Sequence, residues 1–275
     1  MMPHPLSLLK KLSVFFCFYL IVNVAHAQVY NSSTSAATGG TGRATVEPGD
    51  VSFMNPGTMV HLKGRHFFSS FAENQFAASL SDNTKDSAMP AAFAFVKKTS
   101  DVSLGKLEES DMALTLAEFA TEKWAMGVTG HYREQKLPNT SYRQTNADIG
   151  FIYTPRPNIG VALVGYNLFG EDKDAPEELR RKTSAGAGFN YIHNRMVRIR
   201  LDATTESEVM GGLETYMNNF LVSRLGYYND TNDNRELLTA GLGFNGPRFA
   251  LNYAYEGNPK ESGDYRHSVD LGIPF

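Results

Sequence analysis

Apolar and polar residues alternate in short runs along most of the chain. The segments ADIGFIY, from Ala147, and VRIRLDAT, from Val197, both place apolar residues at every second position. This alternation predicts β-strands with one apolar and one polar face. Turn-forming stretches such as NDTNDN and EGNPKESGD separate the runs. The predicted strands cover residues 65–72, 74–81, 90–97, 111–118, 123–134, 142–153, 158–168, 179–191, 195–204, 208–216, 219–228, 235–244, 247–256 and 265–275.

The two faces of these strands favour a transmembrane barrel over a soluble sandwich. One face collects Tyr, Phe and Trp, and the other collects Gly, Ala, Ser and charged residues. A dry sandwich core does not suit Arg198, Arg200 and Asp202, which share one face of one strand, whereas a wet barrel lumen does. We therefore predict an all-β fold, a transmembrane antiparallel barrel of about 14 strands, an even number as in bacterial barrels. The segment 111–118 also fits a short helix. If it and another early segment are not strands, the barrel has about 12 strands.

The chain ends in HSVDLGIPF, which alternates up to its last residue. Val269, Leu271, Ile273 and Phe275 lie on one face of this predicted strand. An open apolar edge invites aggregation, so we expect the last strand to pair with the first and close the barrel. The terminal aromatic residue also resembles the signal that the bacterial barrel-assembly machinery recognises. These four residues are our candidate assembly signal, and that machinery is an expected partner.

The N-terminus and the composition indicate export to the bacterial outer membrane. Lys10 and Lys11 precede the apolar run LSVFFCFYLIVNVA and the small-residue site AHA, as in a cleavable signal peptide covering residues 1–27. An anchoring helix, the alternative, needs about 20 apolar residues. The single cysteine, Cys17, lies within this segment, so the exported chain offers no thiol nucleophile or Cys metal site. The net charge of -3 gives no reason to expect a nucleic-acid partner.

Residues 28–64 lack alternation and are rich in Gly and small polar side chains. Glycines permit tight backbone paths in a narrow space, and an Asn before a Pro favours extended or turn geometry. We predict that this segment is a plug inside the lumen of a barrel formed by residues 65–275. Arg43 and Glu47 are candidates for pairing with lumen charges. A flexible periplasmic tail is the alternative.

The stretch GGTGRATVEPGDVSFMNPGTM, residues 39–59, resembles the N-terminal signature of FadL-type outer-membrane transporters and the related PorV-like proteins. The residues of this plug motif are Gly39, Gly40, Gly42, Arg43, Asn55 and Pro56. Gly57 stands where these families usually have Ala. The resemblance implies a 14-stranded barrel with the N-terminal segment folded into its lumen. In FadL-type members this plug gates hydrophobic compounds, which leave through a gap in the wall, whereas PorV-like barrels assist protein secretion.

Charged residues on neighbouring predicted strands form a candidate lumen cluster. Its members are Arg198, Arg200, Asp202, Glu214 and Arg224. Arginines grip carboxylates bidentately, so the cluster could bind a ligand head group. Alternatively, it is a structural network that fills the lumen and holds the plug. We assign no catalytic residues, metal site or cofactor, because His267 and Ser268, for example, point to opposite faces of their strand.

Three functional hypotheses follow for this non-enzymatic barrel in outer-membrane lipid. The first is a FadL-like passive channel for small hydrophobic compounds, gated by residues 28–64. The second is a PorV-like scaffold or accessory for envelope or secreted proteins. A third is a structural barrel with a permanently occluded lumen. A channel needs an apolar pocket that reaches an opening in the wall, whereas a scaffold needs an exposed face built from loops. The stretch LFGEDKDAPEELRRK is a candidate for such a face. A solvated loop is the default interpretation of so charged a stretch.

Overall fold

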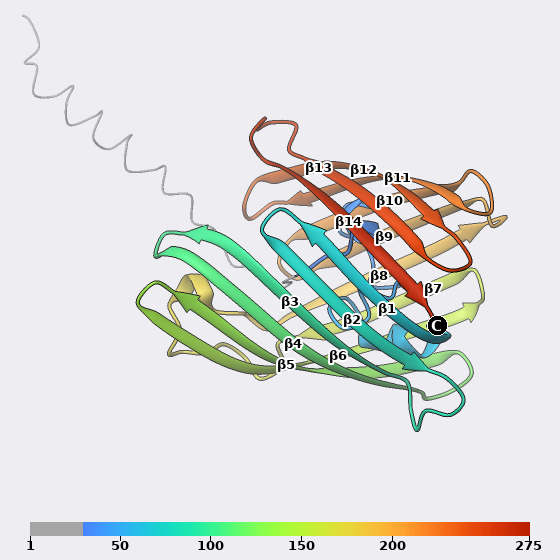
Figure 1. Cartoon of the computed structure of the whole chain (residues 1–275), viewed down its shortest axis with the longest axis horizontal. Helices are drawn as coiled ribbons and strands as arrows, with labels where there is room; N and C mark the ends of the chain where they lie inside the picture. Colours follow the sequence, from blue (N-terminus) through green and yellow to red (C-terminus); the bar gives the residue numbers. More distant parts are fainter. Residues whose placement is uncertain (1–29) are drawn as a thin grey trace, which may run out of the picture.

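Fourteen antiparallel strands form a closed barrel in the computed structural model (Figure 1). The structure describes residues 30–275, so the predicted signal peptide, residues 1–27, lies outside the described residues. The prediction of an all-β, 14-stranded barrel is confirmed, and the alternative count of 12 is wrong. Within the described residues, none of the helices has the length and hydrophobicity needed to cross a membrane.

Each strand is joined to the next along the chain, and the last returns to the first. The strands are β1 Gly64–Ala72, β2 Gln75–Asn83, β3 Ala91–Val102, β4 Gly105–Phe119, β5 Trp124–Leu137, β6 Thr140–Arg156, β7 Ile159–Tyr166, β8 Ser184–His193, β9 Val197–Thr204, β10 Glu208–Tyr216, β11 Leu221–Asp230, β12 Arg235–Asn245, β13 Ala250–Gly257 and β14 Tyr265–Pro274. The uncertain segment 111–118 is the second half of β4 and not a helix. The strand expected from residue 179 starts later, at Ser184, because Leu179 ends a short 3-10 helix, η2 Glu177–Leu179.

The terminal strand closes the barrel by pairing with β1. Phe71 lies opposite Val269, and Phe67 lies opposite Ile273. The backbone N–H of Phe275 donates to the carbonyl oxygen of Arg65 at 3.0 Å, which extends the ladder beyond Pro274. The strand pairs are regular except for one register shift between β6 and β7, at Tyr153 and Arg156.

The outer face of the barrel is apolar, as a surface in contact with lipid requires. Exposed leucines project from the middle of several strands, among them Leu163, Leu225 and Leu242. Aromatic pairs lie near strand ends, such as Trp124 with Tyr153, whose ring centroids are 4.6 Å apart. Aromatic girdles flanking an apolar band are typical of transmembrane barrels.

The long connection between β7 and β8, residues 167–183, lies at the end of the barrel opposite to the C-terminus. Transmembrane barrels have short periplasmic turns and longer extracellular loops. We therefore call this the outer end of the barrel, and the end that carries the C-terminus the inner end.

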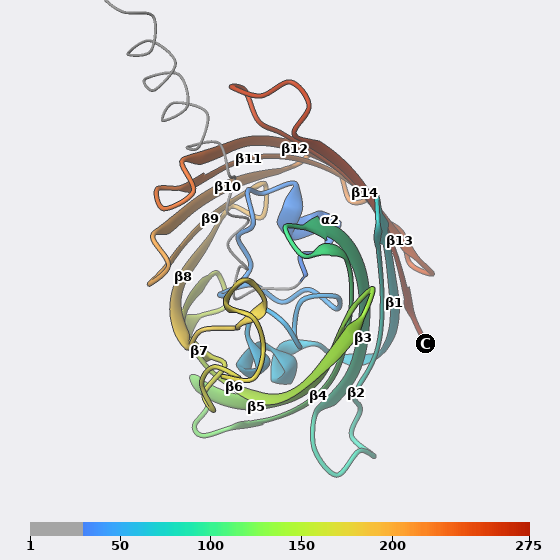
Figure 2. The same cartoon turned by 90° about the vertical axis from the view of Figure 1, so that its left-hand side faces the viewer.

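Residues 30–63 lie inside the ring of strands (Figure 2), as the resemblance to plugged barrels implies. We call this segment the plug. It contains the short helix α2 Ser33–Ala36, which contacts β12, β13 and β14, and the 3-10 helix η1 Pro56–His61, which contacts β4, β5 and β6. Nearly all of its side chains are buried, so the alternative of a flexible tail is wrong.

Candidate functional site: the plug in the lumen

Asp202 of β9 holds the middle of the plug. Its Oδ2 atom accepts hydrogen bonds from the backbone N–H groups of Gly42 at 2.9 Å and Arg43 at 3.0 Å. The Arg43 guanidinium also pairs with this atom at 3.2 Å. Burial opposes the charge on Arg43, but Tyr166 and Asp202 nearby raise its pKa above the ordinary value. One carboxylate of the barrel wall thus binds both the backbone of the plug and its Arg43 side chain.

Asn55 fixes the turn of the plug motif that leads into η1. Its side-chain amide donates to the carbonyl oxygens of Arg43 at 2.7 Å and Phe151 at 3.2 Å. Its oxygen accepts from the N–H of Gly57 at 2.9 Å and so caps η1, whose first residue is Pro56. A proline suits this position because its missing N–H would have no partner there. Asn55 therefore joins two parts of the plug to β6.

Four of the five predicted cluster residues meet around one carboxylate. Glu214 of β10 pairs with Arg198 at 3.2 Å, with Arg224 at 3.0 Å and with Arg200. Glu47 of the plug joins this group through Arg200 at 2.7 Å. Three arginines and two glutamates are thus gathered at the inner half of the lumen, which gives the group an excess of positive charge.

The fifth residue, Asp202, lies apart from this cluster, contrary to the sequence-based grouping. In the register of β9 and β10, Arg198 lies opposite Glu214, whereas Asp202 lies opposite Met210. Alternate residues of a strand are about 6.6 Å apart, so Asp202 is too far along β9 to reach Glu214. The plug supplies Arg43 as its partner instead.

Two more carboxylates hold the outer part of the plug. Asp270 of β14 accepts from the Ser33 hydroxyl at 2.7 Å and from the Ser33 backbone N–H. Asp50, within the plug, accepts from the hydroxyls of Ser32 at 2.8 Å and Ser35 at 2.6 Å. Burial raises the pKa of Asp50 to about 6, although these hydrogen bonds act in the opposite direction.

Glycines in the wall let the plug approach very closely beside α2. A Cβ atom on Gly226 of β11 would lie 2.2 Å from the backbone nitrogen of Gly39. A Cβ atom on Gly212 of β10 would lie 2.5 Å from the Cβ of Thr38. Gly39 has a φ of 70°, which disfavours other residues. The plug motif and the small residues of the wall therefore fit each other directly. We call Gly212, Gly226, Gly241 and Ala254 the plug seat.

A second buried charge network, absent from the predicted sites, lies on β4, β5 and β6. The two ring nitrogens of His131 contact Asp111 at 3.1 Å and Asp148 at 3.0 Å. Arg133 pairs with Asp111 at 2.8 Å. The alternation in GHYRE places His131 and Arg133 on the polar face, but their partners lie on other strands. Single-strand patterns do not reveal such pairings.

The connection 167–183 is folded over the lumen and is only partly solvated. Arg181 pairs with Glu109 of β4 at 2.9 Å, and Leu179 is buried against Leu107. Its other side presents Phe169, whose side chain is exposed. The expectation of a solvated loop holds for residues 171–174 but not for Ala175, Leu179 and Arg181, which are buried.

The predicted assembly residues lie at the outer surface of β14. Val269 and Phe275 are exposed, and Leu271 and Ile273 are half-buried between neighbouring strands. These positions face the surroundings of the barrel and not its lumen. Their role as an assembly signal stays a prediction.

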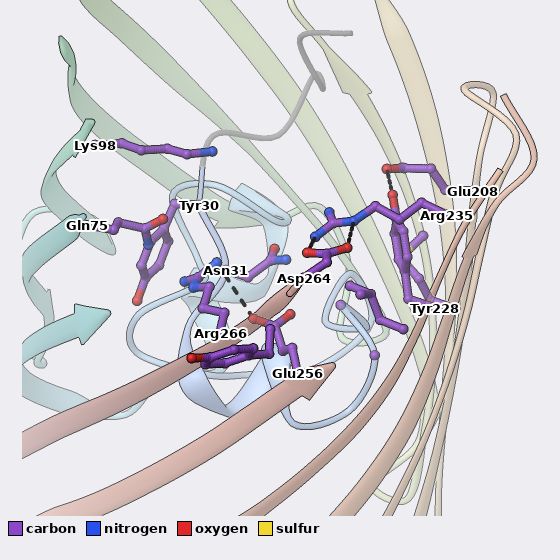
Figure 3. Close-up of a pocket in the computed structure, with 15 residues that line it drawn as sticks. Tyr30, Asn31, Gln75, Lys98, Glu208, Tyr228, Arg235, Glu256, Asp264 and Arg266 are labelled. Carbon is purple, nitrogen blue, oxygen red and sulfur yellow. Dashed lines mark hydrogen bonds and ion pairs between the residues drawn. The ribbon is translucent and has the colours of Figure 1, made fainter. Parts of the chain in front are cut away.

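Two cavities lie beside the plug within the part of the chain that the structure describes. The outer cavity has a volume of about 130 Å³, and its lining includes Tyr30, Lys98, Arg235 and Arg266 (Figure 3). The inner cavity has a volume of about 240 Å³ and is lined partly by the Glu214 cluster. Charged side chains contribute to both linings.

No family model and no curated protein matches this sequence. Solved structures do share its fold. A FadL homologue from Pseudomonas aeruginosa superposes with a TM-score of 0.69 at 10% identity, covering 91% of this chain and 100% of that chain. The Ralstonia pickettii toluene transporter TbuX gives 0.64 at 12% identity, with coverages of 88% and 97%. The CymD monoaromatic hydrocarbon channel gives 0.67 at 13% identity, with coverages of 91% and 99%.

These likenesses confirm the FadL-type barrel fold that residues 39–59 predicted. They extend over nearly the full length of the compared chains, so the plug and the barrel are matched together. At 10–13% identity, these likenesses concern the fold.

Proposed function

We propose that this protein is a passive outer-membrane channel for small compounds and that the plug is its gate. The carrying observation is how the plug is attached near α2. Between Ser33 and Arg43, the plug is held by hydrogen bonds to Asp202 and Asp270, by the ion pair of Arg43 with Asp202, and by one small apolar cluster of Ala36, Ala37 and Ala254. Polar contacts of this kind can exchange with water when the segment moves, at a low net free energy for each bond.

The other end of the plug is attached more firmly. Val51, Met59 and Val60 pack with Ile152 and other wall residues in a larger apolar cluster. Buried apolar area contributes about 25 cal/mol per Å², so this end resists release more than the α2 end does. We infer that the region of α2 moves while η1 stays as an anchor.

The flux assay must also determine whether the transported compound is apolar or polar. The resemblance to FadL-type proteins implies hydrophobic cargo, and TbuX and CymD are described as a toluene transporter and a monoaromatic hydrocarbon channel. The assay should therefore include apolar and polar probes in parallel.

A cysteine lock tests the gate. Ala36→Cys with Ala254→Cys joins α2 to β13, because these residues share one cluster of buried side chains. The matched control is Leu251→Cys with Leu271→Cys, which are opposite one another on β13 and β14 and face outward. The only native cysteine, Cys17, lies in the predicted signal peptide.

In proteoliposomes, oxidation should stop solute flux through the plug-to-wall variant, and reduction should restore it. Flux through the wall-to-wall control should not respond to oxidation. A variant lacking residues 28–63 should conduct steadily. If oxidation of the first variant leaves flux unchanged, or if the truncated barrel is silent although folded, the gate proposal is wrong.

A scaffold function is the second candidate, and the connection 167–183 favours it. Arg181 and Leu179 hold this connection against the barrel, while Phe169 is presented to the outside with 74% of its surface exposed. An exposed aromatic residue on a fixed support is typical of a contact point for another protein. Silence of both the intact and the truncated barrel in the flux assay would support this candidate.

A further inference from the structure

The two cavities lie on the same side of the barrel, and the α2 region separates them. Strands β10 to β14 contribute to both. Their residues at the outer cavity are Glu208, Met210, Tyr228, Arg235, Leu237, Glu256, Tyr265 and Arg266. Their residues at the inner cavity are Glu214, Tyr216, Arg224, Asn245, Ala250, Asn252 and Gly272. The plug seat occupies the positions between these two sets. Movement of residues 33–40 away from the seat would therefore join the cavities into one path along the barrel axis.

In the part of the chain that the structure describes, the wall beside the two cavities offers no comparable path sideways, and the pairing of β10 through β14 is continuous in register. The pairing of β1 with β2, of β2 with β3 and of β3 with β4 is continuous in register. The only register shift is at Tyr153 and Arg156, at the inner end of the barrel. A solute that enters from the outer end thus has the lumen as its route.

Two cations that line the outer cavity are incompletely paired. Lys98 makes no ion pair with the described residues, and its ammonium extends into the cavity (Figure 3). Arg266 has one contact of 3.7 Å with Glu256, and its buried Nε and Nη2 atoms lack hydrogen-bond partners in the described chain. Arg235, by contrast, is fully engaged by Asp264 at 2.9 and 2.7 Å.

Buried donors without partners are costly, and a carboxylate would satisfy them with charge-assisted hydrogen bonds. The inner cavity borders the cluster in which Arg198, Arg200 and Arg224 outnumber Glu47 and Glu214, and Arg198 and Arg224 are part of its lining. An anion that leaves Lys98 and Arg266 therefore meets a second group of cationic side chains at the inner cavity.

We propose that the lumen beside β10 to β14 is an axial route for small solutes that carry a carboxylate. The carboxylate binds first to Lys98 and Arg266 and then passes inward across the plug seat. This inference rests on the proposed gate function and adds to it the class of solute and the direction of exit.

Solute selectivity tests the first half of the inference. Flux into proteoliposomes is compared for succinate, erythritol and 1,4-diaminobutane, which share a four-carbon chain and differ in charge. Succinate should pass fastest. Lys98→Gln should lower the preference for succinate over erythritol by about tenfold, the loss expected for one charge-assisted hydrogen bond. Lys97→Gln is the matched control, because Lys97 is exposed on the other face of β3 and pairs with Glu108.

An obstruction at the inner cavity tests the second half. Ala250→Trp places a large side chain in that cavity and should reduce succinate flux at least about tenfold, because it fills the only exit that the axial route has. Leu251→Trp faces outward and should leave flux unchanged. A gel-shift assay on both variants shows whether the barrel is folded.

The outcomes separate this inference from the gate proposal. The carboxylate assignment is overturned, and the gate stands, if oxidation of the cysteine lock stops the flux of apolar probes while succinate passes no faster than erythritol. If Ala250→Trp folds and leaves succinate flux unchanged, the axial route is overturned. If the barrel lacking residues 28–63 is folded and passes none of the probes, both proposals fail.

Discussion

Arg43 of the plug and Asp202 of β9 form an ion pair of 3.2 Å in which each side chain is about 1% exposed. Asp202 also accepts hydrogen bonds from two backbone N–H groups of the plug. One wall residue therefore binds a guanidinium and two backbone amides of the plug at once. In the proposed gate, this contact belongs to the closed position of the plug.

Asp202→Ala should loosen the plug strongly. Removing one partner of a buried ion pair typically costs about 3–5 kcal/mol, because the remaining charge stays buried without compensation. We expect a lower urea midpoint for unfolding in lipid vesicles and a higher open probability in single-channel recordings. Asp82→Ala removes the partner of Arg65 in an exposed pair and should change neither quantity. Equal behaviour of the two variants would contradict this role for Asp202.

A methyl group on the plug seat should displace α2. The Cβ of Gly212→Ala would lie 2.5 Å from the Cβ of Thr38, and overpacking of this kind costs about 1–3 kcal/mol. We expect a higher open probability and faster proteolysis of the plug. Gly211→Ala is the matched control on the same strand, since its Cβ would meet nothing closer than Leu201 at 3.7 Å. An unchanged open probability in Gly212→Ala would show that the plug shifts without opening a path.

The closed state should weaken as the pH rises from about 4 to about 6. Asp50 has a pKa of about 6 in the folded plug against an ordinary value of 3.8. Between these values the closed plug binds more protons than the released plug, so rising pH favours release. Above about 6 this contribution is constant.

The open probability of the wild type should rise between about pH 4 and about pH 6. This rise should be smaller in Asp50→Asn. Tyr30 and Glu47 of the plug and Asp270 of β14 also face this region, so the difference between the two proteins is the relevant quantity. A step of equal size in both proteins would assign the pH dependence to another group.

The alternation of residues predicted the barrel well, because a period of two is imposed by the pleat of each strand. It also identified Arg198 and Arg200 as lumen residues. It could not show that Asp202 separates from Glu214 or that His131 joins Asp111 and Asp148. Those facts depend on the register between strands and on where the plug lies. Neither is encoded in the pattern of any single strand.

The plug was predictable for a different reason. Its Gly-rich motif resembles that of other plugged barrels, and the match between Gly39 and Gly226 explains why small residues are needed on both sides. The partial burial of residues 167–183 was not predictable from their composition. Arg181 is charged like its solvated neighbours, and only the fold brings Glu109 within reach.

Phe275→Ala separates assembly from stability at the end of β14. The backbone N–H of residue 275 still donates to Arg65, so the last ladder bond is retained while the exposed aromatic ring is lost. If the ring is part of the signal for the assembly machinery, the variant should accumulate less folded barrel in cells and yet refold normally in detergent. Heat-modifiable migration on gels measures both. Phe275→Tyr keeps an aromatic ring and should assemble like the wild type. Impaired refolding in detergent would instead show that the ring stabilises the seam between β14 and β1.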